Sequence, residues 1–208
     1  MATKRFDNLA PERKDAFLLA ARRAFIEKGF EGTSLNDILK AAGMSKGQFY
    51  YYFEDKADLF ATVIAEAFTP YISILDTVGN VQTAGEYWRE LEEYYLKTAE
   101  SLSNEPEIVK LGFGFVQILN SGNPPRAIVE LVSAYRSKSA MLVEKGRRAG
   151  AVTTDMPDDL VLDLLNNIGQ TLDNWSFAHM KTVSVLDITM HTKLSMELFK
   201  CIAGLRIP

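Results

Sequence analysis

Residues 33–60, TSLNDILKAAGMSKGQFYYYFEDKADLF, contain the pattern that decides the fold. Ser34 and Ser45 each stand before a short run in which apolar residues recur at helical spacing, which is where a serine hydroxyl caps the first turn of a helix. Each serine has an Asp or a Gln three residues later, which is the spacing of a capping box. The stretch therefore predicts two short helices, at residues 34–43 and about 45–52.

A tight turn is expected between these two helices. Gly43 supplies the left-handed backbone that such a turn needs, and the two alanines before it allow two helix axes to approach closely. Apolar side chains of both helices would then share one core, formed by Leu35, Ile38, Leu39, Phe49 and Phe53. The pattern predicts a helix–turn–helix unit.

The side of the second helix that faces away from this core carries Lys46, Gly47, Gln48 and the three tyrosines 50–52. It combines a cation, a glycine that allows close backbone approach, an amide able to read adenine edges, and phenols that donate to phosphates. Such a mixture suits a helix whose first turn enters the major groove of DNA. The alternative is a simple packing unit with tyrosines in a core or protein interface, although three consecutive tyrosines on a helix cannot all point inward.

The rest of the chain has the pattern of an all-α protein. Pro11 suits a first helical turn and Gly29 a left-handed C-terminal stop, which predicts a helix over 11–28. Asp55 can cap the helix after the 33–60 pattern, and Pro70 should kink or end it. Because no stretch alternates with period two for long, we expect about nine helices and no sheet.

Composition excludes several classes of protein. The 208 residues are 47% hydrophobic and 24% charged, unlike a disordered chain. The single cysteine, Cys201, excludes a disulfide framework or a cysteine-based zinc site and fits a reducing compartment. The longest charge-free run, 111–125, is too short and polar to span a bilayer, and the N-terminus lacks the apolar core of a secretion signal. We therefore expect a soluble, cytoplasmic protein.

Charge is distributed unevenly. Residues 1–56 hold ten Lys/Arg and eight Asp/Glu, so they carry a net +2, whereas the whole chain carries −4. A basic N-terminal segment on an otherwise acidic chain favours an anionic partner for that segment.

The region around the helix–turn–helix pattern resembles the DNA-binding domain of the TetR family of transcriptional regulators. The resemblance covers about 50 residues, and residue types and spacings agree across three helices and two turns. It is carried by Lys28-Gly29-Phe30, Gly32-Thr33-Ser34, Asp37-Ile38, Ala42-Gly43-Met44-Ser45-Lys46-Gly47, Phe49-Tyr50, Tyr52-Phe53, Lys56 and Leu59.

The resemblance implies a helix–turn–helix DNA-binding domain over residues 1–54 and a ligand-binding and dimerisation domain over 55–208. It implies a homodimer that binds a palindromic operator and that responds to a small-molecule effector, usually as a repressor. Carried over residue by residue, the recognition helix and its flanks would contact DNA through Thr33, Ser34, Ser45, Lys46, Gly47, Gln48, Tyr50, Tyr51 and Lys56. Since Gln48 stands where the family commonly has a small hydroxyl residue, base preference does not transfer.

The C-terminal region offers candidates for an effector pocket. Aromatic residues recur at helical spacing near residue 90, the apolar segment 108–120 contains Gly112 and Gly114 beside two phenylalanines, and neutral amides follow one face of the helix after 157. For each aromatic the alternative is ordinary core. For the amides the alternative is pairing across a dimer interface. The candidates are Trp88, Tyr95, Phe113, Phe115, Gln117, Asn166, Gln170 and Asn174.

Two further helices, at about 157–180 and 184–204, carry apolar stripes that suit a four-helix interface about a twofold axis. Packing within one chain fits the same periodicity. Dimerisation is favoured because one recognition helix reads too few bases for useful selectivity.

No catalytic motif is present, so we expect no enzyme activity, no cofactor and no metal site. The sequence predicts a ligand-responsive regulator, released from its operator by a mostly apolar effector. The alternative is a ligand-binding or scaffold protein that kept the fold and lost specific DNA binding.

Overall fold

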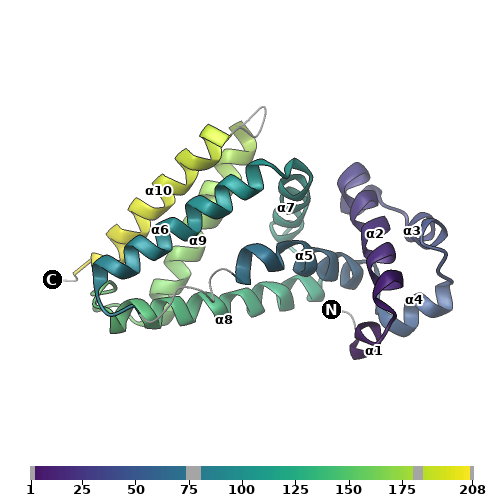
Figure 1. Cartoon of the computed structure of the whole chain (residues 1–208), viewed down its shortest axis with the longest axis horizontal. Coiled ribbons are helices and arrows are strands. Elements are labelled where there is room, and N and C mark those ends of the chain that lie inside the picture. Colours follow the sequence, from purple (N-terminus) through teal and green to yellow (C-terminus); the bar gives the residue numbers. More distant parts are fainter. Residues whose placement is uncertain (1–2, 74–80, 180–184, 207–208) are drawn as a thin grey trace. The chain divides into compact units, whose positions relative to one another are not determined.

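The structure, a computed structural model, describes residues 3–73, 81–179 and 185–206. The described residues form helices and no strand (Figure 1), so the predicted all-α fold is confirmed. The helices are α1 (Lys4–Asp7), α2 (Pro11–Gly32), α3 (Leu35–Ala41), α4 (Lys46–Tyr52), α5 (Lys56–Ser73), α6 (Ala84–Ser103), α7 (Pro106–Leu119), α8 (Arg126–Arg148), α9 (Asp158–His179) and α10 (Val185–Gly204). The predicted helix ends at 180 and 184 lie outside the described residues.

The early helix bounds agree with the sequence pattern, with three differences. Helix α1 was not predicted. Helix α2 continues to Gly32, but its backbone leaves the helical region at Gly29, where φ is 69°, as the predicted stop requires. Helix α5 runs through Pro70 to Ser73, so the proline does not end it at once. Pro70 lies in the last turn of α5, so its missing N–H disturbs only the end of the helix.

The chain divides into two compact units. The first comprises residues 1–69 and 107–133, and the second comprises 70–106 and 134–208. This division differs from the predicted boundary between residues 54 and 55. The first turns of α5 are buried among aromatic side chains of the first unit, where Phe60 packs edge-on against Phe25 with ring centroids 4.8 Å apart.

An aromatic core holds the first unit together. Phe6 from α1, Phe17 from α2 and Phe53 after α4 are each 1% exposed, and their rings lie 4.7 to 6.0 Å apart. Phe49 of α4 stacks on Phe53 at 5.3 Å. Buried aromatic side chains contribute large apolar areas, so a short domain of this kind can fix the orientation of small helices.

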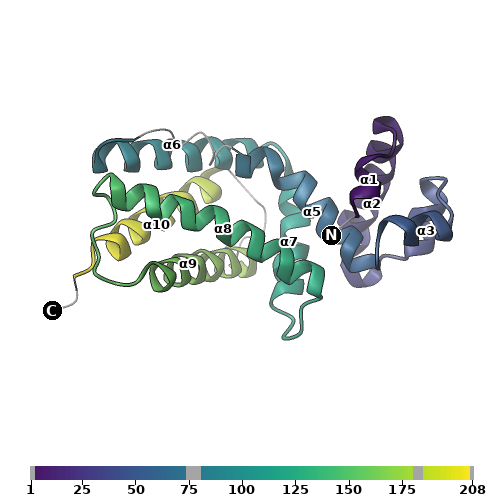
Figure 2. The ribbon, with the colours of Figure 1, turned by 90° about the horizontal axis from the view of Figure 1, so that it is seen from below.

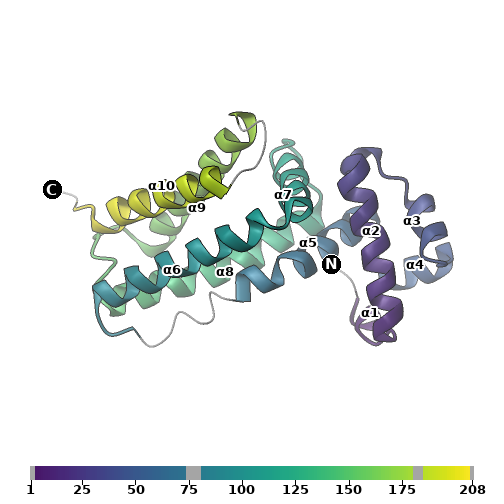
Figure 3. The same ribbon diagram turned by 45° about the horizontal axis from the view of Figure 1, so that its top comes forward.

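The second unit is built around α6, α9, α10 and the later part of α8. Figure 3 shows α10 beside α6 and α9. Met196 of α10 is 1% exposed and packs with Tyr87, Leu91 and Tyr94 of α6. Figure 2 shows the later part of α8 beside α6. Tyr87 Oη of α6 donates a hydrogen bond to the carbonyl of Leu142 in α8 at 3.2 Å.

Two neighbouring residues of α8 fix the loop that leads to α9. A Cβ added at Gly146 would lie 2.6 Å from Val152 Cγ2 and 3.0 Å from the Tyr87 ring, so only glycine fits there. The guanidinium of Arg147 donates to the carbonyls of Thr154 at 2.8 Å and Met156 at 2.6 Å, and it also pairs with Asp158.

In the described part of the chain, no helix has the length and apolarity needed to cross a bilayer.

Candidate nucleic-acid interface

The turn between α3 and α4 is a glycine-terminated helix end. Gly43 has φ 63°. Its N–H donates to the carbonyl of Lys40 at 3.3 Å, and the N–H of Met44 donates to the carbonyl of Leu39 at 2.9 Å. This pair of bonds is a Schellman motif, which satisfies carbonyls that the helix leaves open. Met44 is buried beside the helix end, so the direction in which α4 leaves the turn is fixed.

Helix α4 begins with the predicted capping box. Ser45 Oγ accepts a hydrogen bond from the backbone N–H of Gln48 at 3.2 Å, and Gln48 Oε1 accepts one from the backbone N–H of Ser45 at 3.0 Å. Helix α4 has only seven residues, and the capping box stabilises its first turn. It also occupies the amide oxygen of Gln48, so reading an adenine edge with both amide atoms requires breaking the box.

The two faces of α4 have different surroundings. Ile38, Leu39, Phe49 and Phe53 are at most 4% exposed, which confirms the predicted core except that Leu35 is half-buried. Tyr50 is 61% exposed and Tyr51 is 53% exposed, and Lys46, Gly47 and Gln48 are exposed as well. The tyrosines at 50 and 51 are therefore not core residues of this chain, and the exposed face keeps the chemistry expected of a recognition helix.

Thr33 differs from the expectation that it contacts DNA. Its side chain is buried, and its hydroxyl donates to the carbonyls of Ala24 at 3.0 Å and Gly29 at 2.5 Å. The hydroxyl closes the end of α2 and does not face a phosphate. Ser34 is half-buried, and its Oγ accepts a hydrogen bond from the N–H of Asp37 at 3.4 Å as the cap of α3.

Lys56 also has a structural task that its residue type did not reveal. Its ammonium donates to the carbonyls of Phe30 at 2.7 Å and Thr33 at 3.2 Å, and it lies 4.5 Å from the centre of the Phe30 ring. The predicted phosphate contact would have to use the remaining donor of this ammonium. Asp55, in contrast, caps α5 as predicted, because its Oδ1 accepts a hydrogen bond from the N–H of Asp58 at 2.8 Å.

The same region matches a known protein family. Residues 17–63, from α2 into α5, match the family model described as bacterial regulatory proteins of the TetR family. The region that carries the helix–turn–helix is therefore similar to the TetR family of bacterial regulatory proteins.

Among curated relatives, the chain is 39% identical over 66 residues to the HTH-type transcriptional repressor BepR of Brucella suis, a match that covers 32% of each chain. It is 30% identical over 117 residues to IcaR of Staphylococcus aureus, the negative transcriptional regulator of the biofilm operon icaADBC. That match covers 51% of this chain and 63% of IcaR. The chain therefore matches less than two thirds of the length of either relative.

Solved structures with the TetR fold extend the likeness beyond the DNA-binding region. SmeT, the repressor of the Stenotrophomonas maltophilia multidrug efflux pump SmeDEF, superposes with a TM-score of 0.68 at 16% identity, over 94% of this chain and 91% of SmeT. The SmeT complex with triclosan gives 0.70 at 17% identity, over 91% and 90% of the two chains. At these identities the likeness concerns the fold.

The candidate effector-binding residues fall in both units. Trp88 and Tyr95 on α6 and the three amides on α9 belong to the second unit, whereas the candidates on α7 belong to the first. Tyr95 packs against Phe199 with ring centroids 6.1 Å apart. Gln117, Asn166 and Asn174 are exposed, and Phe113, Phe115 and Gln170 are half-buried.

The two glycines of α7 admit neighbouring side chains. A Cβ at Gly112 would lie 3.0 Å from the ring of Phe68, and one at Gly114 would lie 4.0 Å from the ring of Phe60. Both rings come from α5. The glycines therefore leave room beside α7 for these two rings of α5.

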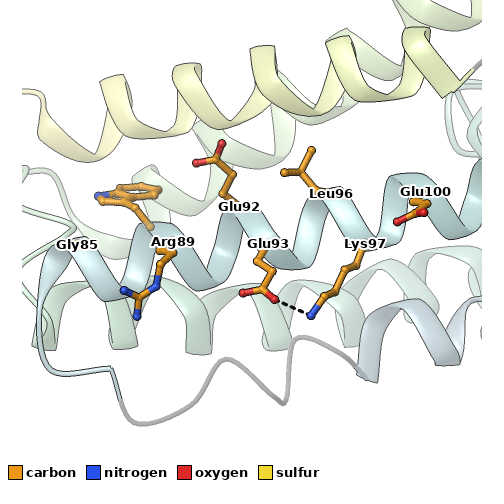
Figure 4. A pocket seen from close by; sticks show the side chains of 8 residues that line it. Gly85, Arg89, Glu92, Glu93, Leu96, Lys97 and Glu100 are labelled. Atoms are coloured by element: carbon orange, nitrogen blue, oxygen red, sulfur yellow. Dashed lines mark ion pairs between the residues drawn. The ribbon is translucent and has the colours of Figure 1, made fainter.

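A groove of about 560 Å³ runs along α6, a size that suits a small organic ligand. Its lining includes Trp88 and Leu96, but most of its residues are charged (Figure 4). Glu93 and Lys97, one turn apart on α6, form an ion pair at 2.7 Å. Of the candidate effector residues, only Trp88 lines this groove. The charged lining differs from the aromatic and amide lining that the sequence predicted.

Tyr135 of α8 is a polar group that sequence reasoning missed. Its hydroxyl is buried and has no hydrogen-bond partner among the described residues. Burial raises the pKa of its phenol to about 12. A buried hydroxyl without a partner is costly in a folded protein, and it is often found where a ligand binds. In the sequence a single tyrosine on a long helix carries no such signal.

Four large apolar side chains of α9 and α10 are exposed among polar residues. Leu160 and Trp175 of α9 are 43% and 55% exposed, and Met190 and Leu194 of α10 are 59% and 49% exposed. The opposite face of α10 is already buried against α6 and α9 through Met196 and Ala203. These four side chains therefore belong to the predicted apolar stripes but not to the core of this chain.

Proposed function

We propose that this protein is a transcriptional repressor of the TetR family that binds a palindromic operator as a homodimer and acts in the cytoplasm. The observation that carries the proposal is the solvent-exposed face of α4, where Lys46, Gly47 and Tyr50 surround a capped first turn. The open N–H groups and the partial positive charge of a helix N-terminus attract phosphates, and the side chains beyond it can reach base edges.

The homodimer is supported by the exposed apolar side chains of α9 and α10, which are Leu160, Trp175, Met190 and Leu194. Exposed Trp, Met and Leu side chains at helical spacing on two neighbouring helices are typical of a face that packs on a second copy. Two helices from each protomer would form a four-helix interface. The dimer then presents two copies of α4, so that each reads one half-site of the operator.

Release by a small molecule is the second part of the proposal. SmeT, whose fold is similar, forms a complex with triclosan. In this chain Trp88 and Tyr135 of the second unit are the side chains best suited to a mostly apolar effector with a hydrogen-bonding group. Helix α5 runs from the first unit into the second, so an effector that shifts α5 would change the spacing of the two recognition helices away from one turn of DNA, about 34–36 Å.

A binding or scaffold protein that has lost DNA affinity is the rival function. It predicts that the face of α4 is used for another partner or not at all. The exposed cation and phenols on that face favour DNA binding, because Lys46, Tyr50 and Tyr51 lie outside the buried core.

The proposal is tested by selecting duplexes from a random DNA pool with the purified full-length chain. The expected winners are palindromes whose half-sites lie one helical turn apart, bound with an affinity that falls steeply as salt rises. Lys46→Ala and Tyr50→Phe should each weaken binding while the thermal unfolding midpoint stays unchanged. Failure to enrich any duplex at low salt would overturn the proposal. Compounds that release the selected duplex then identify the effector class.

A further inference from the structure

Helix α1, just before the family match, is fixed in place by one buried side chain. Phe6 is 1% exposed, and its ring packs edge-on against Phe53 at 4.7 Å and Tyr52 at 5.6 Å. The first contact belongs to the core of the DNA-binding unit, and the second belongs to α4 itself. A helix of only four residues has no stability of its own, so this aromatic anchor determines where α1 lies.

The backbone ties the same segment to the end of α4. The N–H of Thr3 donates to the carbonyl of Tyr52, the last residue of α4, at 2.9 Å. Carbonyls in the last turn of a helix lack partners within the helix, so this bond also closes α4. Figure 1 shows α1 beside α4, and the two helices are in contact.

Arg5 extends from this anchored segment over α4. The centre of its guanidinium lies 4.6 Å from the centroid of the Tyr51 ring, and both side chains are exposed. Among the described residues no carboxylate forms an ion pair with Arg5, while its neighbour Asp7 pairs with Lys14 at 3.5 Å. The charge of Arg5 is therefore not neutralised within the described part of the chain.

A guanidinium that lies over an aromatic ring still has N–H groups that the ring does not use. Those groups match the paired oxygens of a phosphate, which a lysine binds only as a point charge. The geometry places such groups next to Tyr51, on the face of α4 that is proposed to meet DNA.

We propose that Arg5 is a further DNA contact, which binds a backbone phosphate beside Tyr51 and thereby extends the interface beyond the helix–turn–helix. The inference rests on the proposed function, since it needs α4 to face DNA. It adds a cation outside the family match of residues 17–63. The anchor through Phe6 and the bond from Thr3 hold this cation in position before DNA binds, which lowers the entropy lost on binding.

The test is the salt dependence of binding to the duplex selected above. Wild type, Arg5→Ala, Arg5→Lys and a control, Arg148→Ala, are titrated at several salt concentrations. Arg148 is an exposed arginine of the second unit. For a dimer, Arg5→Ala should reduce the slope of log K against log salt by about 1.8, because each phosphate contact contributes about 0.9. Arg5→Lys should keep most of the slope and lose part of the affinity, and the control should match wild type.

The outcomes separate the inference from the function. A wild type that binds no duplex would overturn both. A wild type with a steep slope and an Arg5→Ala variant with the same slope would overturn the inference alone. If Arg5→Ala lowers the affinity for DNA but leaves the salt slope unchanged, Arg5 only positions Tyr51, and the proposed phosphate contact is wrong. Thermal unfolding midpoints within a degree or two of wild type confirm that the variants are folded.

Discussion

Gln48 Oε1 accepts a hydrogen bond from the backbone N–H of Ser45 at 3.0 Å, although Gln48 is also exposed on the face of α4 that we assign to DNA. The side chain of Gln48 therefore has two competing functions. As a helix cap it must keep its oxygen on its own backbone, and as a base reader it must turn that oxygen toward DNA. Its amide N–H groups stay available in either case.

Substitution of Gln48 can separate the two tasks. Gln48→Glu keeps an acceptor for the Ser45 N–H and adds a negative charge in the first turn, so the fold should be as stable as wild type or more stable by about 0.3–1 kcal/mol. Gln48→Ala loses the acceptor and should cost about 0.5–1 kcal/mol. Both should weaken binding of the selected duplex, and the glutamate more, because it repels phosphates. Urea unfolding and gel shifts measure the two effects. A glutamate variant that binds as well as wild type would contradict the interface.

The two lysines of the DNA-binding unit should respond differently to removal. Lys46 is exposed at the start of α4, whereas Lys56 donates to the carbonyls of Phe30 and Thr33. Lys46→Ala should leave stability unchanged and reduce the salt slope of DNA binding by about 1.8 for a dimer. Lys56→Ala leaves two half-buried carbonyls without this donor and should cost about 1–3 kcal/mol of unfolding free energy. Equal stabilities for the two variants would show that the capping bonds of Lys56 are unimportant.

Alkaline pH should destabilise the second unit. Burial raises the pKa of both Tyr87 and Tyr135 to about 12, whereas a phenol in the unfolded chain has a pKa near 10. The unfolded chain therefore loses these protons first, so the stabilisation is complete below pH 10 and is lost as pH rises from about 10 to 12. Urea midpoints at pH 7, 10 and 11.5 measure this loss. Tyr135→Phe should make it smaller, while Tyr50→Phe, which removes an exposed phenol, should not change it.

The elements that the sequence predicted well are those with local chemical causes. The Schellman turn at Gly43, the capping box of Ser45 and the cap by Asp55 depend on residues within a few positions of one another. Their spacing is visible in the sequence because the hydrogen bonds are local. The exposure of Tyr50 followed equally from helical geometry.

The contacts that the sequence did not reveal concern residues whose partners are distant in the sequence. Lys56 reaches the carbonyl of Phe30, and Arg5 reaches the ring of Tyr51, across separations that no local pattern encodes. Thr33 looks like any helix-flanking threonine, yet its hydroxyl is buried against the end of α2. The ring of Phe68 occupies the space beside Gly112, which the sequence could equally have left for a ligand. Such outcomes depend on how helices pack, and packing is not fixed by periodicity alone.

The oligomeric state gives the last prediction. Leu194 is 49% exposed on the outward face of α10, and Met141 is 56% exposed on α8. Leu194→Glu would bury a charge in the proposed four-helix interface, so it should produce monomers with an unchanged helix content. Met141→Glu is the control at a similar exposure and should stay dimeric. Sedimentation at micromolar concentration measures the difference. Because a monomer brings one recognition helix in place of two, Leu194→Glu should also bind the palindrome at least a hundredfold more weakly, close to its affinity for unrelated DNA. A Leu194→Glu protein that remains a dimer would place the interface elsewhere, and a wild type that is monomeric at this concentration would rule out the interface.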